Sequence, residues 1–307
     1  MLKTGIVLIL LLITEAFCHD RQFSPISNVE NEMICDADRW QMEKNETGFD
    51  RNRRFVLENV IDEETCRILV ELNQHMGIAG DGYAKRTRKK RGSPYTNFES
   101  YIGLTPERVF EAYQNGTVGQ KQIVKLMNSI NKVRTLSEQL HRTDSQLYNY
   151  FVHLVCREGF EDDETNRDLK VDLSHPIHAD SCSIQRPDGS CNEFQDYMPR
   201  NVSALLYLSN DYEGGEFFFT NRPNYNVTEM VVKGKCGTMV SFNSGEFHGV
   251  RALKKVRNPF DKLLCRNEID FSHFIFLVQG RRCALALWMT LNESFADKFY
   301  SRQFLSL

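Results

Sequence analysis

The stretch HPIHADSC, residues 175–182, concentrates two histidines, an aspartate and a cysteine in one short segment. In an extended strand, side chains two positions apart project from the same face. His178 and Asp180 therefore project together if residues 177–182 are extended. Two histidines and one carboxylate form the facial triad of non-haem Fe(II) oxygenases, which leaves coordination positions open. Because H-x-D also occurs by chance, this interpretation requires a second histidine from elsewhere in the chain.

The best candidate for that third ligand is His248, in SGEFHGV, which follows the predicted strand GTMVSF and a turn. His153 lies in an apolar strand and is predicted to be a core histidine. His175 precedes a proline, which favours an extended or turn conformation at the entry of a strand. His75 and His141 are predicted on helix surfaces. We therefore predict a metal site formed by His178, Asp180 and His248.

An oxygenase that uses 2-oxoglutarate also needs a cation for the distal carboxylate, and GRRCALALW offers two arginines. If Arg282 points inward, Ala284 and Ala286 do too, which leaves room for a small diacid. If Arg281 pointed inward, two leucines would fill that room. Because arginine also suits bidentate carboxylate binding, we predict that Arg282 binds 2-oxoglutarate.

The elements that must position these residues change in type along the chain. Apolar periodicity and capping residues predict helices from Asp62 to about His75, from Thr105-Pro106 onward, and over residues 118–141. After Asp144 the pattern changes to strands separated by glycine-marked turns. The predicted strands include YNYFVHLVCRE, VSALLYLSN, GEFFFT, MVVKGKC, GTMVSF and CALALWMTL.

Helices followed by many short strands predict an α+β fold, a double-stranded β-helix (jelly roll) with packed N-terminal helices. In such a barrel, H-x-D on one strand and a histidine on another can lie close together. The predicted organisation is a signal peptide at 1–18, an N-terminal extension at 19–53, a helical support region at 54–143 and a dioxygenase core at 144–298.

The first residues, MLKTGIVLILLLITEAFC, have the basic start, apolar stretch and small-residue end of a secretory signal peptide. The apolar run is short for a membrane-spanning helix, so we predict no stable membrane span. Nine cysteines are compatible with disulfides in an oxidising compartment. Five N-x-S/T sequons point to the same compartment, and they are at Asn45, Asn115, Asn201, Asn226 and Asn292.

Composition argues against a disordered chain and against a protein that binds nucleic acid or an anionic membrane. A hydrophobic share of 41% predicts a globular domain rather than a disordered chain. The formal net charge of -3 does not suggest a nucleic-acid or anionic-membrane partner. One basic tract, KRTRKKR at residues 85–91, is best interpreted as a solvated loop, with a docking patch or a proteolytic site as alternatives.

Several ordered stretches resemble the catalytic region of the prolyl 3-hydroxylases, the leprecan family. The resemblance begins at VLENVIDEETC and DGY and runs to about Leu291, so it covers most of the mature chain. The stretches are LYNYFVHLVCRE, SHPIHADSC, SALLYLSNDYEGGEFFFT, KCGTMVSFNSG, HGVRAL and RRCALALWMTL. By motif, the resemblance implies that His178, Asp180 and His248 ligate iron and that Arg282 binds 2-oxoglutarate.

This resemblance further implies a double-stranded β-helix enzyme that uses Fe(II), 2-oxoglutarate, O2 and ascorbate on proline of collagen-like polypeptides. The endoplasmic reticulum lumen or the extracellular space is the implied location, with chaperones or prolyl isomerases as possible partners. The chain departs from the family in three respects. The cysteine-patterned N-terminal region is missing, SRQFLSL is not a retrieval signal, and the spacing differs between Asp196 and Ser203.

Cys182 and Cys191 flank a short loop directly after the metal motif, so a disulfide between them is the preferred pairing. Pairing of either one with another cysteine remains an alternative. Two other functions also stay open. The chain could be another secretory-pathway hydroxylase of prolyl (position 4) or lysyl residues, or a non-catalytic secreted jelly-roll glycoprotein.

Residues 256–279, VRNPFDKLLCRNEIDFSHFIFLVQ, separate His248 from Arg282, which lie close together in the family. Without them, HGVRALKK joins GRRCALALW directly. The Val-Arg start and the Phe-Leu-Val-Gln end can be encoded by splice-donor-like and T-rich acceptor-like codons. We therefore infer a retained intron, which would leave Cys265 and His273 without a functional role. The alternative is a surface loop, although FSHFIFLV would then expose an apolar run.

Overall fold

A computed structural model provides the structure of the chain. It describes residues 54–79, 99–143, 145–159, 173–182, 199–220, 228–254 and 280–303. Residues 1–53, the basic tract at 85–91 and the insert at 256–279 lie outside this part of the chain.

Two antiparallel sheets form the centre of the described structure. The larger sheet has the order β1 (Arg54–Leu57), β10 (Met239–Asn243), β6 (Val202–Tyr207), β13 (Arg281–Thr290), β4 (Tyr148–Gly159), β3 (Glu99–Leu104) and β2 (Ile78–Ala79). The smaller sheet has the order β5 (Leu173–His178), β11 (His248–Arg251), β8 (Phe217–Thr220) and β9 (Thr228–Val232). A short ribbon pairs β12 (Leu253–Lys254) with β7 (Glu213–Gly214).

From β4 to β13, the chain crosses repeatedly between the two sheets. Strands β4, β6, β10 and β13 lie in the larger sheet, whereas β5, β8, β9 and β11 lie in the smaller one. Two facing sheets that exchange strands in this way form a jelly roll, as predicted from the sequence. The inner faces of both sheets enclose a common interior, and this interior contains the candidate site.

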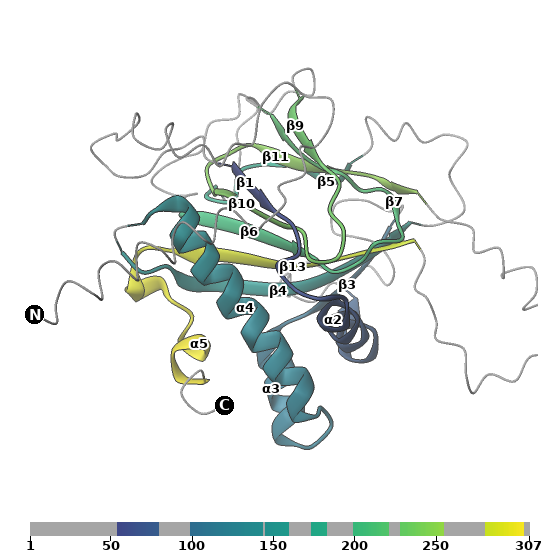
Figure 1. Cartoon of the computed structure of the whole chain (residues 1–307), viewed down its shortest axis with the longest axis vertical. Helices are drawn as coiled ribbons and strands as arrows, with labels where there is room; N and C mark the ends of the chain where they lie inside the picture. The colour runs from purple at the N-terminus through teal and green to yellow at the C-terminus, as the bar shows by residue number, and fades with distance from the viewer. Residues whose placement is uncertain are drawn as a thin grey trace, which may run out of the picture.

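Helices cover the outer face of the larger sheet, and the smaller sheet lies on the opposite side (Figure 1). Helix α2 (Glu63–Met76) begins after Asp62, whose carboxylate accepts a hydrogen bond of 2.7 Å from the backbone N–H of Thr65. Helices α3 (Pro106–Gln114) and α4 (Gln120–His141) follow, so the three predicted helices are confirmed. The chain ends with the short η4 (Glu293–Phe295) and α5 (Lys298–Gln303).

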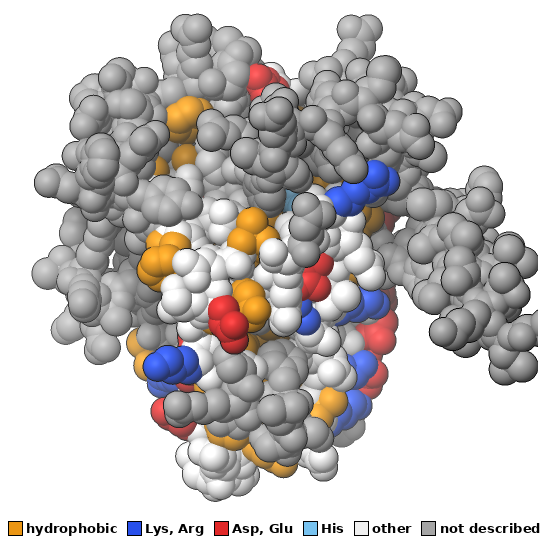
Figure 2. Space-filling view, turned by 90° about the vertical axis from the view of Figure 1, so that its left-hand side faces the viewer, with side chains coloured by type: hydrophobic (Ala, Val, Ile, Leu, Met, Phe, Trp, Pro, Cys, Tyr) orange, Lys and Arg blue, Asp and Glu red, His pale blue; other side chains and the backbone are white. Residues whose placement is uncertain are grey.

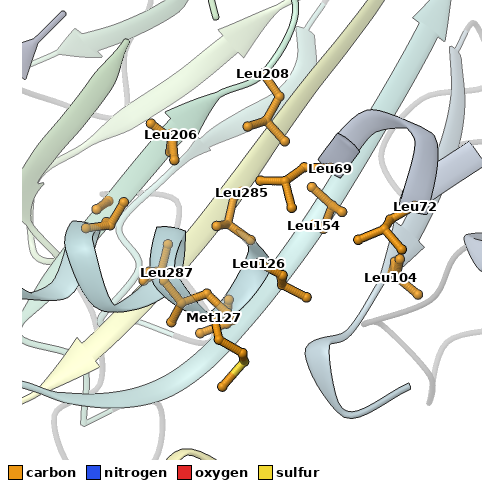
Figure 3. Packing of buried hydrophobic residues seen from close by; sticks show 14 of the residues in the cluster. Leu69, Leu72, Leu104, Leu126, Met127, Leu154, Leu206, Leu208, Leu285 and Leu287 are labelled. Carbon is orange, nitrogen blue, oxygen red and sulfur yellow. The ribbon is translucent and has the colours of Figure 1, made fainter. Parts of the chain in front are cut away.

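The main core lies between these helices and the outer face of the larger sheet. Leu285 and Leu287 of β13 pack with Leu69 of α2 and with Leu126 and Met127 of α4 (Figure 3). Leu285 and Leu287 are both fully buried. Burial of a leucine side chain stabilises a fold by roughly 1.5–3 kcal/mol. Because alternate residues of a strand face opposite ways, these two leucines direct their neighbours in β13 toward the interior of the barrel.

Disulfides connect parts of the fold that are distant in the sequence. Cys66 of α2 is bonded to Cys236, just before β10, and Cys156 of β4 is bonded to Cys283 of β13. Cys182 is also disulfide-bonded. Its preferred partner, Cys191, lies outside the described residues, so that pairing remains a prediction.

The region before residue 144 contributes strands as well as helices. Strand β1 pairs with β10, and β3 pairs with β4, so both extend the larger sheet. The sequence analysis predicted only helices there. In β3, the fully buried Glu99 and the nearly buried Tyr101 face inward, and this polar inner face hides the alternation that marks a strand.

His141 differs from its predicted place on a helix surface. It is only 2% exposed, and its Nε2 lies 3.0 Å from the hydroxyl of Ser241 on β10. The last turn of α4 packs against the sheet, where this serine supplies a polar partner. A polar residue at the end of an amphipathic helix can therefore be buried when the facing strand offers a hydrogen bond.

Surface features bear on the glycosylation sites. On the face that Figure 2 shows, acidic, basic and hydrophobic side chains of the described residues are interspersed. The sequon residues Asn115 and Asn292 are exposed, whereas Asn201 is partly buried and its Oδ1 accepts a hydrogen bond of 2.9 Å from Leu291 N–H. Asn45 and Asn226 lie outside the described residues.

Among the helices of the described segments, none is long and apolar enough to cross a bilayer.

The inferred intron would fall between two strands. Strand β12 ends at Lys254, β13 begins at Arg281, and residues 256–279 lie outside the described structure between them. Removal of those codons therefore leaves every described strand complete. We expect sequence reads from mature transcript to join the codons for Lys255 and Gly280 directly. Transcripts that retain the segment and encode active protein would contradict the intron interpretation.

Candidate metal centre

Three side chains, from two paired strands and the turn that follows one of them, meet inside the barrel. His178, at the end of β5, lies directly opposite His248, the first residue of β11. His178 Nε2 is 3.3 Å from Asp180 Oδ1, and His248 Nε2 is 3.6 Å from Asp180 Oδ2. One ligand atom from each residue lies within 4.8 Å of the others. The structure thus brings together the two histidines and the carboxylate that the sequence analysis singled out.

The local backbone fixes the orientation of these ligands. Strand β5 ends at His178, and Asp180 lies in the turn that follows rather than in an extended strand through residue 182. The backbone N–H of Ser181 donates to the carbonyl of Ser244, at 2.9 Å, which holds this turn against the end of β10. Asp180 therefore remains on the inner side, as predicted, although the strand is shorter.

Each histidine has a backbone carbonyl close to its Nδ1. His178 Nδ1 is 2.8 Å from Pro176 O, and His248 Nδ1 is 2.9 Å from Glu246 O. A proton on Nδ1 satisfies each carbonyl and leaves the lone pair of Nε2 for a metal. The backbone thereby selects the tautomer in which both Nε2 atoms face the carboxylate.

Electrostatics favour the protonation states that a metal needs. Burial raises the pKa of Asp180, but the adjacent His248 and His178 lower it more, so its pKa lies well below the usual range. Burial, together with His178, lowers the pKa of His248 to about 4. At neutral pH the site therefore holds a carboxylate and a neutral imidazole at these two positions. Metal ligands of both types must be deprotonated to bind.

Two aromatic rings pack against His248 on the side that faces the interior of the barrel. Its ring centroid lies 5.1 Å from that of Phe217 on β8 and 4.7 Å from that of Phe242 on β10. The N-terminal strand also reaches this region, because Arg54 forms ion pairs with Glu246 and Glu229. His248 is only 4% exposed, so its position is set by packing on several sides.

Arg282 points into the barrel and Arg281 does not. Arg282 is 7% exposed and lines the same cavity as the three ligands, whereas Arg281 forms an ion pair of 3.0 Å with Glu158. Arg282 Nη1 donates to the carbonyl of Gly215, at 3.2 Å. Gly215 has φ +68, and a Cβ there would lie 3.2 Å from Arg282 Cδ. Glycine therefore permits the close approach of the β7–β8 turn to this arginine.

A second buried arginine lies directly opposite Arg282, on β4. Arg157 is 3.7 Å from the carboxylate of the fully buried Glu99, and it donates to Ser174 O at 2.6 Å. Within the described residues, Arg282 has no carboxylate partner. Arg157 is paired with Glu99, whereas Arg282 forms no ion pair in the described structure, so its guanidinium is suited to bind an anion.

Tyr207 is a candidate that the sequence analysis missed. It lies on β6 opposite Ala284, lines the same cavity and is 1% exposed. Burial raises its pKa to about 12, although the nearby Arg282 acts in the opposite direction. The phenol is therefore a neutral donor at physiological pH. The inward alternation of Ser203, Leu205 and Tyr207 in VSALLY was the signal that could have identified it.

The interior cavity joins the ligands to these donors. Its volume is about 80 Å³, and its lining includes the three metal-ligand candidates, Arg282, Tyr207 and the small side chains of Ala284 and Ala286. Arg282 Nε and Tyr207 Oη are buried, and neither has a hydrogen-bond partner in the described structure. Buried polar atoms in this situation indicate a missing acceptor. The cavity therefore fits a metal bound by two imidazoles and a carboxylate, together with a small anion.

His175 lies closer to this site than the sequence suggested. The pairing of β5 with β11 shifts between His178 and His175, because His248 faces His178 and Val250 faces His175. This irregularity turns both histidines to the same side, and their ring centroids lie 4.1 Å apart. His175 lines the cavity, but it does not belong to the group whose ligand atoms converge.

Comparison with known proteins identifies relatives of the chain. No family model matches it. It is 36% identical over 248 residues to prolyl 3-hydroxylase 2 of Gallus gallus, covering 80% of this chain and 31% of the relative. It is 32% identical over 250 residues to prolyl 3-hydroxylase 1 of Rattus norvegicus, covering 80% of this chain and 30% of the relative.

A similar solved structure is a prolyl-4-hydroxylase of Pseudomonas putida, with 13% identity, a TM-score of 0.41, and coverage of 78% of this chain and 92% of that one. The curated relatives are much longer than the part that matches, since the chain covers 31% of the Gallus gallus protein. The relationship therefore concerns one region of those proteins. Through this region, the chain belongs to the prolyl 3-hydroxylase family.

Proposed function

We propose that the chain is an Fe(II)- and 2-oxoglutarate-dependent dioxygenase that hydroxylates prolyl residues at carbon 3 in collagen-like polypeptides. The observation that carries the proposal is the cavity that joins His178, Asp180 and His248 to Arg282, a buried cation without a carboxylate partner in the described structure. The similarity to prolyl 3-hydroxylases supports the choice of substrate and position.

In this proposal, His178, Asp180 and His248 hold the metal through one face. Arg282 and Tyr207 bind the distal carboxylate of 2-oxoglutarate, because their unpartnered donors line the same cavity. When bound, the iron and 2-oxoglutarate supply O2 activation, with succinate and CO2 as products, and ascorbate maintains the iron as Fe(II). The residues of the chain orient the cosubstrate and keep water out of the apolar interior.

The proposed location is the secretory pathway, in the endoplasmic reticulum lumen or after secretion. The predicted signal peptide, the disulfides Cys66–Cys236 and Cys156–Cys283 and the exposed sequon residues Asn115 and Asn292 support it. Resident chaperones or prolyl isomerases are the proposed partners. No nucleic-acid partner is proposed.

Mass spectrometry of a collagen-like peptide tests the function. The peptide is incubated with the protein, Fe(II), 2-oxoglutarate and ascorbate, and amino-acid analysis then separates 3-hydroxyproline from 4-hydroxyproline and hydroxylysine. We expect one added oxygen per modified proline, located at carbon 3, and none with Asp180→Ala protein. Product at carbon 4 or on lysine would assign the chain to another hydroxylase class. Absence of both product and succinate would contradict an oxygenase.

A further inference from the structure

Two buried arginines line the candidate cavity. Arg157 on β4 lies directly opposite Arg282 on β13, and both side chains contribute to the lining. Their exposed fractions are similar, at 3% for Arg157 and 7% for Arg282. A dicarboxylate inside the barrel therefore meets two guanidinium groups of equal charge on neighbouring strands. Its position in the cavity depends on which of the two it binds.

Glu99, the first residue of β3, is a fully buried carboxylate beside Arg157. Its Oε2 lies 3.7 Å from Arg157 Nη1 and accepts a hydrogen bond of 2.6 Å from the hydroxyl of Ser174 on β5. Its Oε1 accepts a hydrogen bond of 2.7 Å from the backbone N–H of Leu253 on β12. Because donors from two other strands hold both oxygens, the carboxylate is fixed next to Arg157.

The two arginines have different surroundings. Arg157 Nη1 also donates to the carbonyl of Ser174, at 2.6 Å, and its guanidinium carbon lies 4.9 Å from the ring centroid of Tyr101. Arg282 Nη1 instead donates to the neutral carbonyl of Gly215, and its Nε has no hydrogen-bond partner in the described structure. Within the described residues, Arg157 is therefore neutralised by a carboxylate and Arg282 is not.

We infer that Glu99 is a specificity-determining residue: by neutralising Arg157, it leaves Arg282 as the guanidinium that binds the distal carboxylate of the cosubstrate. This inference rests on the proposed function. A buried cation that already has a carboxylate partner gains little from a second one, whereas an unpaired buried cation is strongly stabilised by an anion. Neighbouring strands lie about 5 Å apart, so a cosubstrate bound to Arg157 would be displaced by that distance relative to the metal ligands.

A second substitution in Arg282→Ala protein tests the inference. Glu99→Gln keeps the size of the side chain and one acceptor oxygen but removes the charge, so Arg157 becomes the unpaired cation. We expect Arg282→Ala/Glu99→Gln protein to bind 2-oxoglutarate about tenfold more tightly than Arg282→Ala protein, the effect of one hydrogen bond between charged groups. Calorimetric titration of Fe(II)-loaded protein without O2 measures this affinity in the absence of turnover. If Glu99 had only a structural role, its substitution would weaken binding or leave it unchanged.

Glu158→Gln is the matched control. Glu158 pairs with Arg281 on the same two strands, at 3.0 Å, but neither residue lines the cavity. In Arg282→Ala protein, this change should leave the affinity for 2-oxoglutarate as it was. No gain from Glu99→Gln, or an equal gain from Glu158→Gln, would overturn the inference.

Steady-state kinetics of the single variant provide a second readout. With Arg282 intact, Glu99→Gln leaves two unpaired guanidinium groups, and cosubstrate bound to Arg157 does not react. We expect kcat and the KM for 2-oxoglutarate to fall together, by roughly twofold if the two arginines bind equally well, so that kcat/KM stays constant. A raised KM with an unchanged kcat would contradict binding at Arg157.

One further variant covers the case in which an unpaired Arg157 prevents folding. Glu99→Gln/Arg157→Met removes both charges of the buried pair, a change that proteins often tolerate. Because Arg282 remains, we expect the affinity for 2-oxoglutarate to stay near the wild-type value. A loss as large as that in Arg282→Ala protein would show that Arg157 binds the cosubstrate, and the inference would be wrong. If wild-type protein itself binds no 2-oxoglutarate, the proposed function fails, so the two failures are distinguishable.

Discussion

Loss of any one ligand is expected to abolish both iron binding and succinate formation. His178→Ala, Asp180→Ala and His248→Ala each remove one of the three side chains whose ligand atoms lie within 4.8 Å of one another. With two ligands left, the buried site no longer binds the metal on three sides, and turnover should fall to background. Iron content after dialysis and succinate release in the presence of peptide measure the two effects.

His175→Ala is the matched control for these variants. Its ring lies 4.1 Å from that of His178, so the substitution disturbs the same cavity without removing a convergent ligand. We expect this variant to keep nearly all of its iron. Iron loss in His175→Ala protein together with iron retention in His178→Ala protein would show that the two histidines have been assigned the wrong way round.

The common orientation of His178 and Asp180 could be predicted from the sequence because it depends on a short-range pattern. H-x-D requires only that residues 178 and 180 face one way, and this holds although β5 ends at His178. The place of Arg282 followed in the same way from the alternation in β13, which Leu285 and Leu287 anchor by packing against α2 and α4. The alternation of residues along a strand predicts which side chains face inward wherever one face of the strand is buried in apolar core.

Other features depend on contacts between distant residues. The side of the strand on which His175 lies is set by an irregular pairing with β11, and no pattern within HPIHADSC encodes that shift. Likewise, Glu99 neutralises Arg157 across 58 positions of sequence, counted from their numbers, and the two are brought together only by sheet pairing. This ion pair neutralises Arg157 rather than Arg282, and the sequence alone does not show which of the two arginines is paired.

Disulfide pairing also depends on contacts between residues that are distant in the sequence. The sequence analysis proposed only the pair Cys182–Cys191, whereas Cys66–Cys236 and Cys156–Cys283 join elements that are far apart along the chain. The second of these lies next to Arg157 and Arg282 on neighbouring strands. It therefore fixes the strand pair that carries both arginines, a role that spacing alone does not indicate.

Arg282→Ala is expected to raise the KM for 2-oxoglutarate by roughly 10²–10⁴-fold, since removal of one partner from a buried charge pair costs about 3–5 kcal/mol. The guanidinium is buried and lacks a carboxylate partner in the described structure, so its replacement leaves the cosubstrate anion unpaired. Iron content should change little, because Arg282 is not among the convergent ligands. Succinate formation at varied 2-oxoglutarate, together with iron content, measures both effects.

Three further variants define the geometry of this contact. Arg282→Lys should fall between wild type and Arg282→Ala, because lysine keeps the charge but lacks the planar fork that binds a carboxylate through two hydrogen bonds. Tyr207→Phe should raise the same KM by about tenfold, the effect of one lost hydrogen bond. Arg281→Ala removes an arginine that pairs with Glu158 outside the cavity, so the KM should stay near the wild-type value. Equal effects of Arg281→Ala and Arg282→Ala would mean that the side chains of β13 do not alternate as the packing of Leu285 and Leu287 requires.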